Sequence, residues 1–281
     1  MSEENEKKTD AGRQEALNKL RTSPELFVLI SLCTKMPYVM CDPETFDDEI
    51  FLYEKEEDVK KEAVALVQQK IPVHVAKIEN QQFLNFYANL YTMGVNCIVY
   101  NWKMDSEVKL QLPELVRRPG IENLPEGKIW VENPSLHLTA LYFMQEVRKQ
   151  KLEKLTPELK EMQDEILADY GRGTFLAAVH EENGVPLMKQ KNGDSYQPIF
   201  TDALEFRKFN KDNKFRAVVV KAQKVVDVLA KEAKGVVINP MGVNLQLPVV
   251  RRNQPQETAP GETPNKESAP APKAAEEKPA E

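Results

Sequence analysis

The sequence predicts an α/β protein in which two tandem, duplicated domains each build a mixed sheet with packed helices. Segments typical of strands and of helices alternate along most of the chain, as such sheets require. The segment 108–113 (VKLQLP) matches 243–248 (VNLQLP) at every position but one, and a pair of arginines follows each copy. Upstream, residues 97–101 (CIVYN) parallel 235–239 (GVVIN). Landmarks in one order, at similar separation, indicate a duplicated domain, because solenoid repeats are far shorter.

The stretch 234–248 (KGVVINPMGVNLQLP) predicts a β-hairpin. Residues 236–238 are β-branched, which suits a buried strand. Residues 239–242 supply turn chemistry, and Gly242 is expected to adopt the left-handed conformation that closes the turn. Apolar and polar residues then alternate over 243–248, so the second strand is expected to be covered on one face only.

The first domain is expected over residues 14–118, after a polar and disordered N-terminus at 1–13. Ser23-Pro24-Glu25 predicts a helix start, with Ser as N-cap and Pro in the first turn, and Thr156-Pro157-Glu158 predicts a second such start. The other expected strands of this domain are 38–41, 50–53, 72–77, 97–100 and 108–112, and the other expected helices are 56–70 and 81–93.

A linker at 119–155 includes a helix, expected at 135–152, that bridges the two domains. The second domain is expected over 156–252, with a buried strand at 215–221 and a helix at 223–234 that Gly235 closes. Residues 253–281 contain no aliphatic side chain larger than Ala, so this tail is expected to be disordered. The other expected strands of the second domain are 174–180, 185–190 and 196–200, and its other helices are one starting at 157 and one at 203–209.

The composition argues against several classes of function. The 281 residues carry a formal net charge of -6, which argues against nucleic acid or an anionic membrane surface as the main partner. The N-terminus has no apolar core of a signal peptide, and no apolar run approaches the roughly 20 residues of a spanning helix. Cys33, Cys41 and Cys97 lack CxxC spacing and are expected to be small core residues in a reducing compartment. We therefore expect a cytoplasmic protein.

The second domain resembles the N-terminal domain of the SseB family (enhanced serine sensitivity protein B) over roughly residues 156–250. The residues that carry this resemblance are 198–202 (PIFTD), a strand that runs into a capped helix, with Phe206 and Phe209 beyond it, and the hairpin 234–248. The resemblance implies the fold and the duplication. The family has no defined biochemical activity, and its name implies only a link to serine tolerance, and through it to amino-acid or sulfur metabolism.

The first domain is similar to a diverged second copy of that family domain. It keeps Asn101 and the LQLP strand, but residues 102–107 replace the Pro-Met-Gly turn. It also has Leu52-Tyr53 where the second domain is expected to have Thr201-Asp202.

No catalytic, cofactor-binding or metal-binding residue is expected. His180-Glu181-Glu182 has no second histidine at the spacing of a zinc helix, and we interpret it as a solvated turn. His74 and His137 occupy ordinary positions on a strand face and near a helix start. Gly171-Arg172-Gly173 precedes a strand instead of following one, which indicates a helix-ending turn and not a dinucleotide loop.

The remaining candidates form a possible recognition loop with anion contacts. Turn geometry alone would explain the loop residues, and exposed charge alone would explain the arginines. The candidates are Asn239, Pro240, Gly242, Arg251 and Arg252 in the second domain and Asn101, Arg117 and Arg118 in the first.

The sequence thus favours a non-enzymatic protein-interaction or regulatory protein that binds an unidentified protein partner and neither nucleic acid nor membrane. The alternative is a sensor of an amino acid or another metabolite, with the ligand at the sheet ends or in an interdomain cleft. An enzyme with unrecognised carboxylate chemistry is a third hypothesis, against which the missing nucleophile, metal set and glycine-rich loop count.

Overall fold

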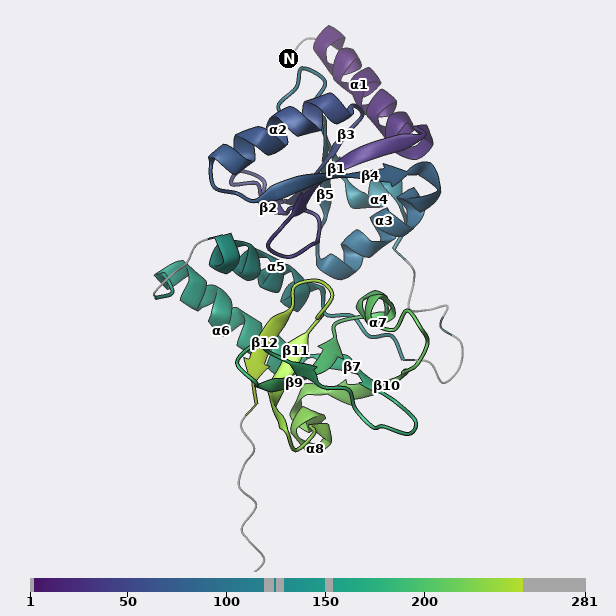
Figure 1. The fold of residues 1–281 in the computed structure, drawn as a ribbon. Coiled ribbons are helices and arrows are strands. Elements are labelled where there is room, and N and C mark those ends of the chain that lie inside the picture. Colours follow the sequence, from purple (N-terminus) through teal and green to yellow (C-terminus); the bar gives the residue numbers. More distant parts are fainter. Residues whose placement is uncertain (1–2, 119–123, 125–128, 150–153, 250–281) are drawn as a thin grey trace, which may run out of the picture. The chain divides into compact units, whose positions relative to one another are not determined.

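Two six-stranded mixed sheets with the same strand order form the framework of the protein (Figure 1). The computed structural model describes residues 3–118, 124, 129–149 and 154–249. The first sheet has the order β4 (Val73–Glu79), β1 (Glu25–Ser31), β3 (Asp48–Tyr53), β5 (Cys97–Tyr100) and β6 (Val108–Gln111), with β2 (Met40–Cys41) beside β3. The second has the order β10 (Arg216–Lys221), β7 (Thr174–Val179), β9 (Ser195–Phe200), β11 (Ala233–Ile238) and β12 (Leu245–Pro248), with β8 (Met188–Lys189) beside β9.

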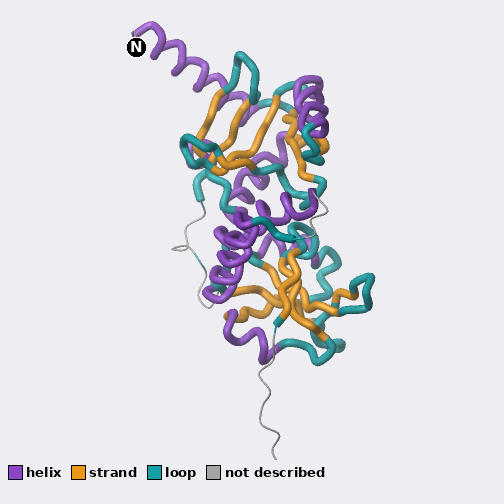
Figure 2. Tube along the Cα trace, turned by 90° about the vertical axis from the view of Figure 1, so that its left-hand side faces the viewer, coloured by secondary structure: helices purple, strands orange, loops and turns teal. Residues whose placement is uncertain are grey.

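Each sheet contains one parallel pair, β3 with β5 and β9 with β11, while the other pairs are antiparallel. Figure 2 shows the strands as orange groups with purple helices against them. The predicted mixed α/β class with two sheets is therefore confirmed. The helices are α1 (Glu3–Thr22), α2 (Glu56–Gln68), α3 (Asn80–Met93), α4 (Leu112–Leu115), α5 (Pro134–Lys149), α6 (Pro157–Arg172), α7 (Ala203–Phe209) and α8 (Val225–Val228), with a 3-10 turn at Ala222–Lys224.

Helices cover both faces of the first sheet. On one face α2 packs its buried Val59, Ala63 and Leu66 against the strands. On the other face α1 and α3 pack against residues such as Leu26 and Val28 of β1. Because both faces are buried, the central strands β1, β3 and β5 are apolar at most positions and do not alternate.

This burial explains why the predicted helix after Ser23-Pro24-Glu25 is wrong. Residues 25–31 (ELFVLIS) form β1, which lies between β4 and β3. The helix lies before this point instead, since α1 runs from Glu3 to Thr22 and includes most of the segment predicted to be disordered. The parallel Thr156-Pro157-Glu158 does open a helix, because Thr156 accepts a hydrogen bond from the Leu159 N–H at the start of α6.

Strand pairing also corrects the register of the repeat. Leu110 pairs with Ile98 in the first sheet and Leu247 pairs with Val236 in the second, so the two LQLP segments are offset by two residues in space. Likewise Leu52 lies beside Tyr100 and Ile199 lies beside Ile238. Glu54-Lys55, and not Leu52-Tyr53, therefore occupy the place of Thr201-Asp202.

Two predictions about a helix and a strand of the second domain are wrong. The helix expected at 223–234 shrinks to the 3-10 turn and α8, because Ala233 and Gly235 pair in β11. The strand expected to be buried at 215–221 is β10, an edge strand whose residues are mostly exposed. Helices α5 and α6 bury residues such as Phe175 and Val236 on one face of the second sheet. The other face is covered near Phe200 by the seven-residue α7.

Gly235 should be intolerant of any side chain. A Cβ there would lie 2.1 Å from the Leu247 carbonyl oxygen and 2.8 Å from the Pro248 Cα, and both of these are backbone atoms of β12. We expect Gly235→Ala to lower the free energy of unfolding by about 2 kcal/mol or more, measured by urea unfolding. Gly171→Ala is the control, because nothing lies within 4 Å of that position and a helical alanine should cost nothing. An unchanged urea midpoint for Gly235→Ala would contradict the β11–β12 pairing.

Candidate functional site

The predicted recognition turn is mostly internal to the fold. Asn239, Gly242 and Val243 are buried, and Met241 is 47% exposed. The left-handed residues are Asn239 (φ 46°) and Asn244 (φ 48°), so the left-handed conformation predicted for Gly242 is wrong. Gly242 is needed for another reason. A Cβ there would lie 3.1 Å from Oε2 of Glu205 and 3.2 Å from Sδ of Met36, a residue that precedes β2.

Asn239 ties together the ends of two strands. Its N–H donates to the Ile199 carbonyl at 3.0 Å, its Oδ1 accepts from the Thr201 N–H at 3.0 Å, and its Nδ2 donates to the Thr201 hydroxyl at 2.8 Å. Asn101 repeats this arrangement in the first sheet, with bonds to the Leu52 carbonyl at 2.8 Å and the Glu54 N–H at 3.1 Å. The two asparagines, which were predicted as recognition residues, therefore hold the ends of neighbouring parallel strands together by hydrogen bonds. Their backbone is left-handed, a conformation that Asn adopts more readily than most residues.

A buried histidine that the sequence did not single out lies beside this network. His137 of α5 is fully buried, and its Nδ1 lies 3.2 Å from the Thr92 carbonyl oxygen, 3.4 Å from Oγ1 of Thr201 and 3.8 Å from Oδ2 of Asp202. Because a carbonyl only accepts, Nδ1 carries the proton in this arrangement. Nε2 is buried and has no hydrogen-bond partner among the described residues. The one hint in the sequence is the position of His137 between Leu136 and Leu138.

Asp202 joins the histidine to α7. Its Oδ1 accepts from the N–H groups of Leu204 (2.8 Å) and Glu205 (3.0 Å), as predicted for a helix cap, and its Oδ2 accepts from the Thr201 hydroxyl at 2.8 Å. Burial opposes ionisation of Asp202, but the nearby His137 and these hydrogen bonds outweigh it and hold the pKa of Asp202 below its ordinary value.

Thr201, His137 and Asp202 are the residue types of a nucleophile, base and orienting acid. Their relative exposures are 0%, 0% and 1%, so a substrate has no access to them in this conformation. Nδ1 of the histidine, moreover, is shared with the Thr92 carbonyl. The arrangement supports packing and not nucleophilic catalysis.

Further along α5, two polar side chains bind backbone groups of loops next to the two sheets. Gln145 accepts from the Val39 N–H at 3.2 Å and donates to the Val39 carbonyl at 3.0 Å. Arg148 donates to the carbonyls of Cys33 (2.5 Å) and Asn244 (2.9 Å). The bridging helix predicted at 135–152 thus holds the predicted recognition turn against the loop before β2.

The predicted anion contacts receive no support as a site. Arg118 pairs with Glu132 and lies 5.8 Å from the centre of the Tyr91 ring, while Arg117 is exposed. Arg251, Arg252 and the tail 253–281 lie outside the described residues. Pro240 is half-buried in the turn described above.

Acidic residues near β3 form a second polar cluster. Hydrogen bonds from Lys109 and from the N–H groups of Glu44 and Thr45 lower the pKa of Asp42 to about 2, and burial raises the pKa of Glu49. In the part of the chain that the structure describes, no three His, Cys, Asp or Glu side chains could hold a metal ion. Cys33 and Cys97 are buried as predicted, and burial raises the pKa of Cys97 to about 12. Cys41 is exposed, so its predicted core position is wrong.

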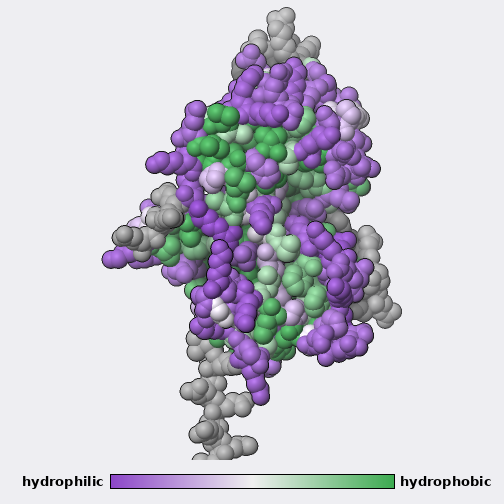
Figure 3. All heavy atoms as spheres, viewed as in Figure 1, coloured by the Kyte–Doolittle hydropathy of each residue, from purple (hydrophilic) through white to green (hydrophobic). Residues whose placement is uncertain are grey.

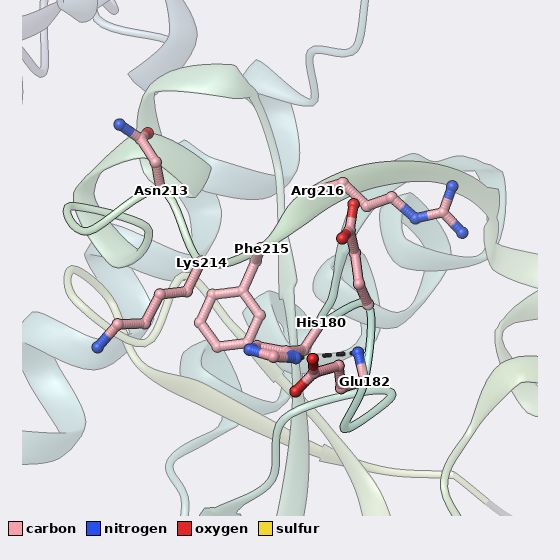
Figure 4. A pocket seen from close by; sticks show the side chains of 7 residues that line it. His180, Glu182, Asn213, Lys214, Phe215 and Arg216 are labelled. Carbon is pink, nitrogen blue, oxygen red and sulfur yellow. Dashed lines mark hydrogen bonds between the residues drawn. The ribbon is translucent and has the colours of Figure 1, made fainter.

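A surface pocket of about 370 Å³ lies beside the second sheet, where β7 ends and β10 begins (Figure 4). Its turn is organised by Nδ1 of His180, which accepts from the N–H groups of Glu182 and Asn183 at 3.2 Å, as suits the predicted turn. The His180 and Phe215 rings meet edge to face, with centroids 5.9 Å apart. The pocket is lined by His180, Glu181, Glu182, Asn213, Lys214, Phe215 and Arg216.

Comparison with known proteins assigns one part of the chain. Residues 150–251 match the family model of the SseB protein N-terminal domain, which covers α6 and the second sheet. The predicted resemblance of the second domain is therefore confirmed, whereas the first sheet lies outside the match. No curated protein matches the chain. No helix in the described ranges has the length and apolar character that crossing a membrane requires.

Two solved structures are similar to the chain. Tic22 from Plasmodium falciparum is 12% identical, with 79% of this chain and 89% of that chain covered and a TM-score of 0.21. Anabaena Tic22 (protein transport) is 11% identical, with 79% of this chain and 91% of that chain covered and a TM-score of 0.21. At these TM-scores the likeness carries no argument about fold or function.

Asn239→Ala should be strongly destabilising. It removes two buried hydrogen bonds with Thr201 and leaves alanine in the left-handed region, so we expect a loss of about 2–4 kcal/mol in the free energy of unfolding. Asn244→Ala isolates the backbone cost, because Asn244 has φ 48° and its hydrogen bonds use its backbone groups. Its expected loss is about 1 kcal/mol. Equal losses in urea unfolding would show that the Asn239 side chain contributes nothing.

Asp202 should make stability depend on pH. Because its pKa is lowered in the folded protein, the ionised carboxylate stabilises the fold above the ordinary aspartate pKa of about 3.9, and this contribution is lost as the pH falls through the folded value. Asp202→Asn keeps a capping side chain without the charge. Its deficit in unfolding free energy should be full at neutral pH and should shrink below about pH 4. A deficit that stays constant from neutral to acid pH would contradict this role.

Proposed function

We propose that the chain is a non-enzymatic protein-interaction or regulatory protein whose SseB N-terminal domain binds a protein partner. The observation that carries the proposal is the uncovered apolar area on the α7 side of the second sheet. There Ala217 pairs with Ala178 and Val219 pairs with Leu176, so these four side chains share one face, on which Leu176 and Ala178 are buried and the two β10 residues are not. Val219 is 38% exposed and Ala217 is exposed. In Figure 3 hydrophobic side chains gather over β7 and β10, and hydrophilic ones surround them.

The first sheet provides the contrast. Its equivalent edge strand, β4, packs beneath the 13-residue α2, and Val73 on that face is only 5% exposed. In the second sheet the seven-residue α7 stands at the equivalent point of the chain. An apolar area with a polar rim is typical of a surface that binds another protein.

The residue types that could act as a catalytic triad are inaccessible to a substrate, which supports a binding function over an enzymatic one. His137, Thr201 and Asp202 are buried and engaged in packing, as is the turn that includes Asn239. A regulatory role linked to amino-acid or sulfur metabolism remains part of the proposal and rests on the family name alone.

The alternative is a metabolite sensor. The pocket beside His180 has a volume of about 370 Å³, which falls within the range of small-molecule sites. A thermal-shift screen with amino acids, nucleotides and common metabolites separates the two proposals, because a ligand at a hundredfold excess over its Kd adds about 2.7 kcal/mol of stability.

Val219→Glu tests the interaction surface. The charge would sit beside Ala217 and Leu176 on this face, so we expect at least about a tenfold loss of quantitative partner capture, with an unchanged melting temperature. Val64→Glu is the matched control, since Val64 is 57% exposed on α2 and lies outside this surface. Capture that survives Val219→Glu, together with a reproducible melting shift for one metabolite class, would favour the sensor.

A further inference from the structure

The edge strand β10 presents backbone groups that another strand could use. It ends its sheet, and among the described strands it pairs with β7 alone. In an antiparallel pair alternate residues direct their N–H and C=O groups to the neighbour, so the others direct theirs outward. The burial of β10 agrees with an open edge, because one of its six residues is buried. Such an edge is a template for strand addition unless it is protected.

The cationic side chains on and near β10 determine which partner strands could pair with this edge. Between residues 206 and 221 the chain carries six cationic side chains and a single acidic one, Asp212, although the whole chain has a net charge of -6. Cationic side chains at an edge repel other cationic strands and so act as protection. The same charges attract an acidic strand, so they also set the chemistry of a productive partner. The cations are Arg207, Lys208, Lys211, Lys214, Arg216 and Lys221, of which Lys208 pairs with Glu205 and Lys214 pairs with Asp212.

The pocket beside His180 adds a concave contact at one end of the edge. In Figure 4 the side chains of Lys214 and Arg216 extend to opposite sides of the Phe215 ring, with His180 against that ring. A partner segment that pairs along the whole of β10 would lie near Lys214 and Arg216 at one end and near Lys221 at the other end. Its apolar side chains would lie beside Ala217 and Val219, on the uncovered face.

We infer that β10 binds an extended, acidic segment of a partner protein by strand addition, with alternate apolar side chains on the α7 side of the sheet. This inference rests on the proposed function and names its partner class. Main-chain hydrogen bonds supply affinity in this mode of recognition, and the side-chain contacts supply specificity.

The test uses the full chain and a synthetic probe, the capped peptide Asp-Val-Glu-Val-Glu-Val-Asp labelled for fluorescence anisotropy. We expect salt-sensitive binding and slower amide hydrogen exchange at β10. Two control peptides define the mode. One carries N-methyl groups on alternate residues, which removes the paired N–H groups, and the other has lysine in place of each acid. Both should bind at least about tenfold more weakly.

Charge reversal on the protein completes the test. Arg216→Glu/Lys221→Glu should weaken the probe at least about tenfold, whereas Lys70→Glu/Lys160→Glu, which makes the same charge change at exposed positions elsewhere, should not. Equal binding of the N-methylated peptide would overturn strand addition. If the probe fails to bind while partner capture stays sensitive to Val219→Glu, the inference is wrong and the proposed function stands. If that capture is also absent, both are wrong.

Discussion

Helix α5 is the constraint on which the rest of the structure depends. One continuous cluster of buried apolar residues includes Leu136 and Leu141 of α5 together with strand residues of both sheets, such as Val28 and Val236. Polar groups of a helix in this position must find partners inside the protein, because an unpaired buried group costs about 1–3 kcal/mol. Gln145 and Arg148 meet this requirement at carbonyl and N–H groups of loops next to both sheets, and Nδ1 of His137 meets it at the Thr92 carbonyl of α3.

The two sheets share a topology but differ in what covers them. Asn101 and Asn239 make equivalent hydrogen bonds at the ends of β5 and β11, so the same type of hydrogen bond links the two parallel strands in each sheet. The two sheets differ most in the segment that follows β3 in the first sheet and β9 in the second. A long helix, α2, fills it in the first sheet, and α7 with a cationic loop fills it in the second. This difference leaves Ala217 and Val219 of β10 exposed on the α7 side and locates the proposed binding surface in the domain that matches the SseB family model.

Local signals in the sequence predicted much of this fold. Thr156 and Asp202 cap their helices, and the hairpin of β11 and β12 has the expected strands. Prediction failed where distant contacts decide the outcome. Residues 25–31 are a strand because both faces are buried. The contacts of His137 are not visible locally, because its partners Thr92 and Thr201 are 45 and 64 positions away. Nothing local marks Ala217 and Val219 of β10 as exposed, because their exposure follows from the shortness of α7.

Hydrogen exchange followed by mass spectrometry in increasing urea tests the central claim, that α5 makes both sheets one cooperative unit. We expect amides of β3 and β5 to lose protection at the same urea concentration as those of β9 and β11. We also expect Gln145→Ala/Arg148→Ala to separate the two transitions, because the loops before β2 and after β11 then lose their shared anchor. Separate transitions in the unaltered protein would contradict the claim.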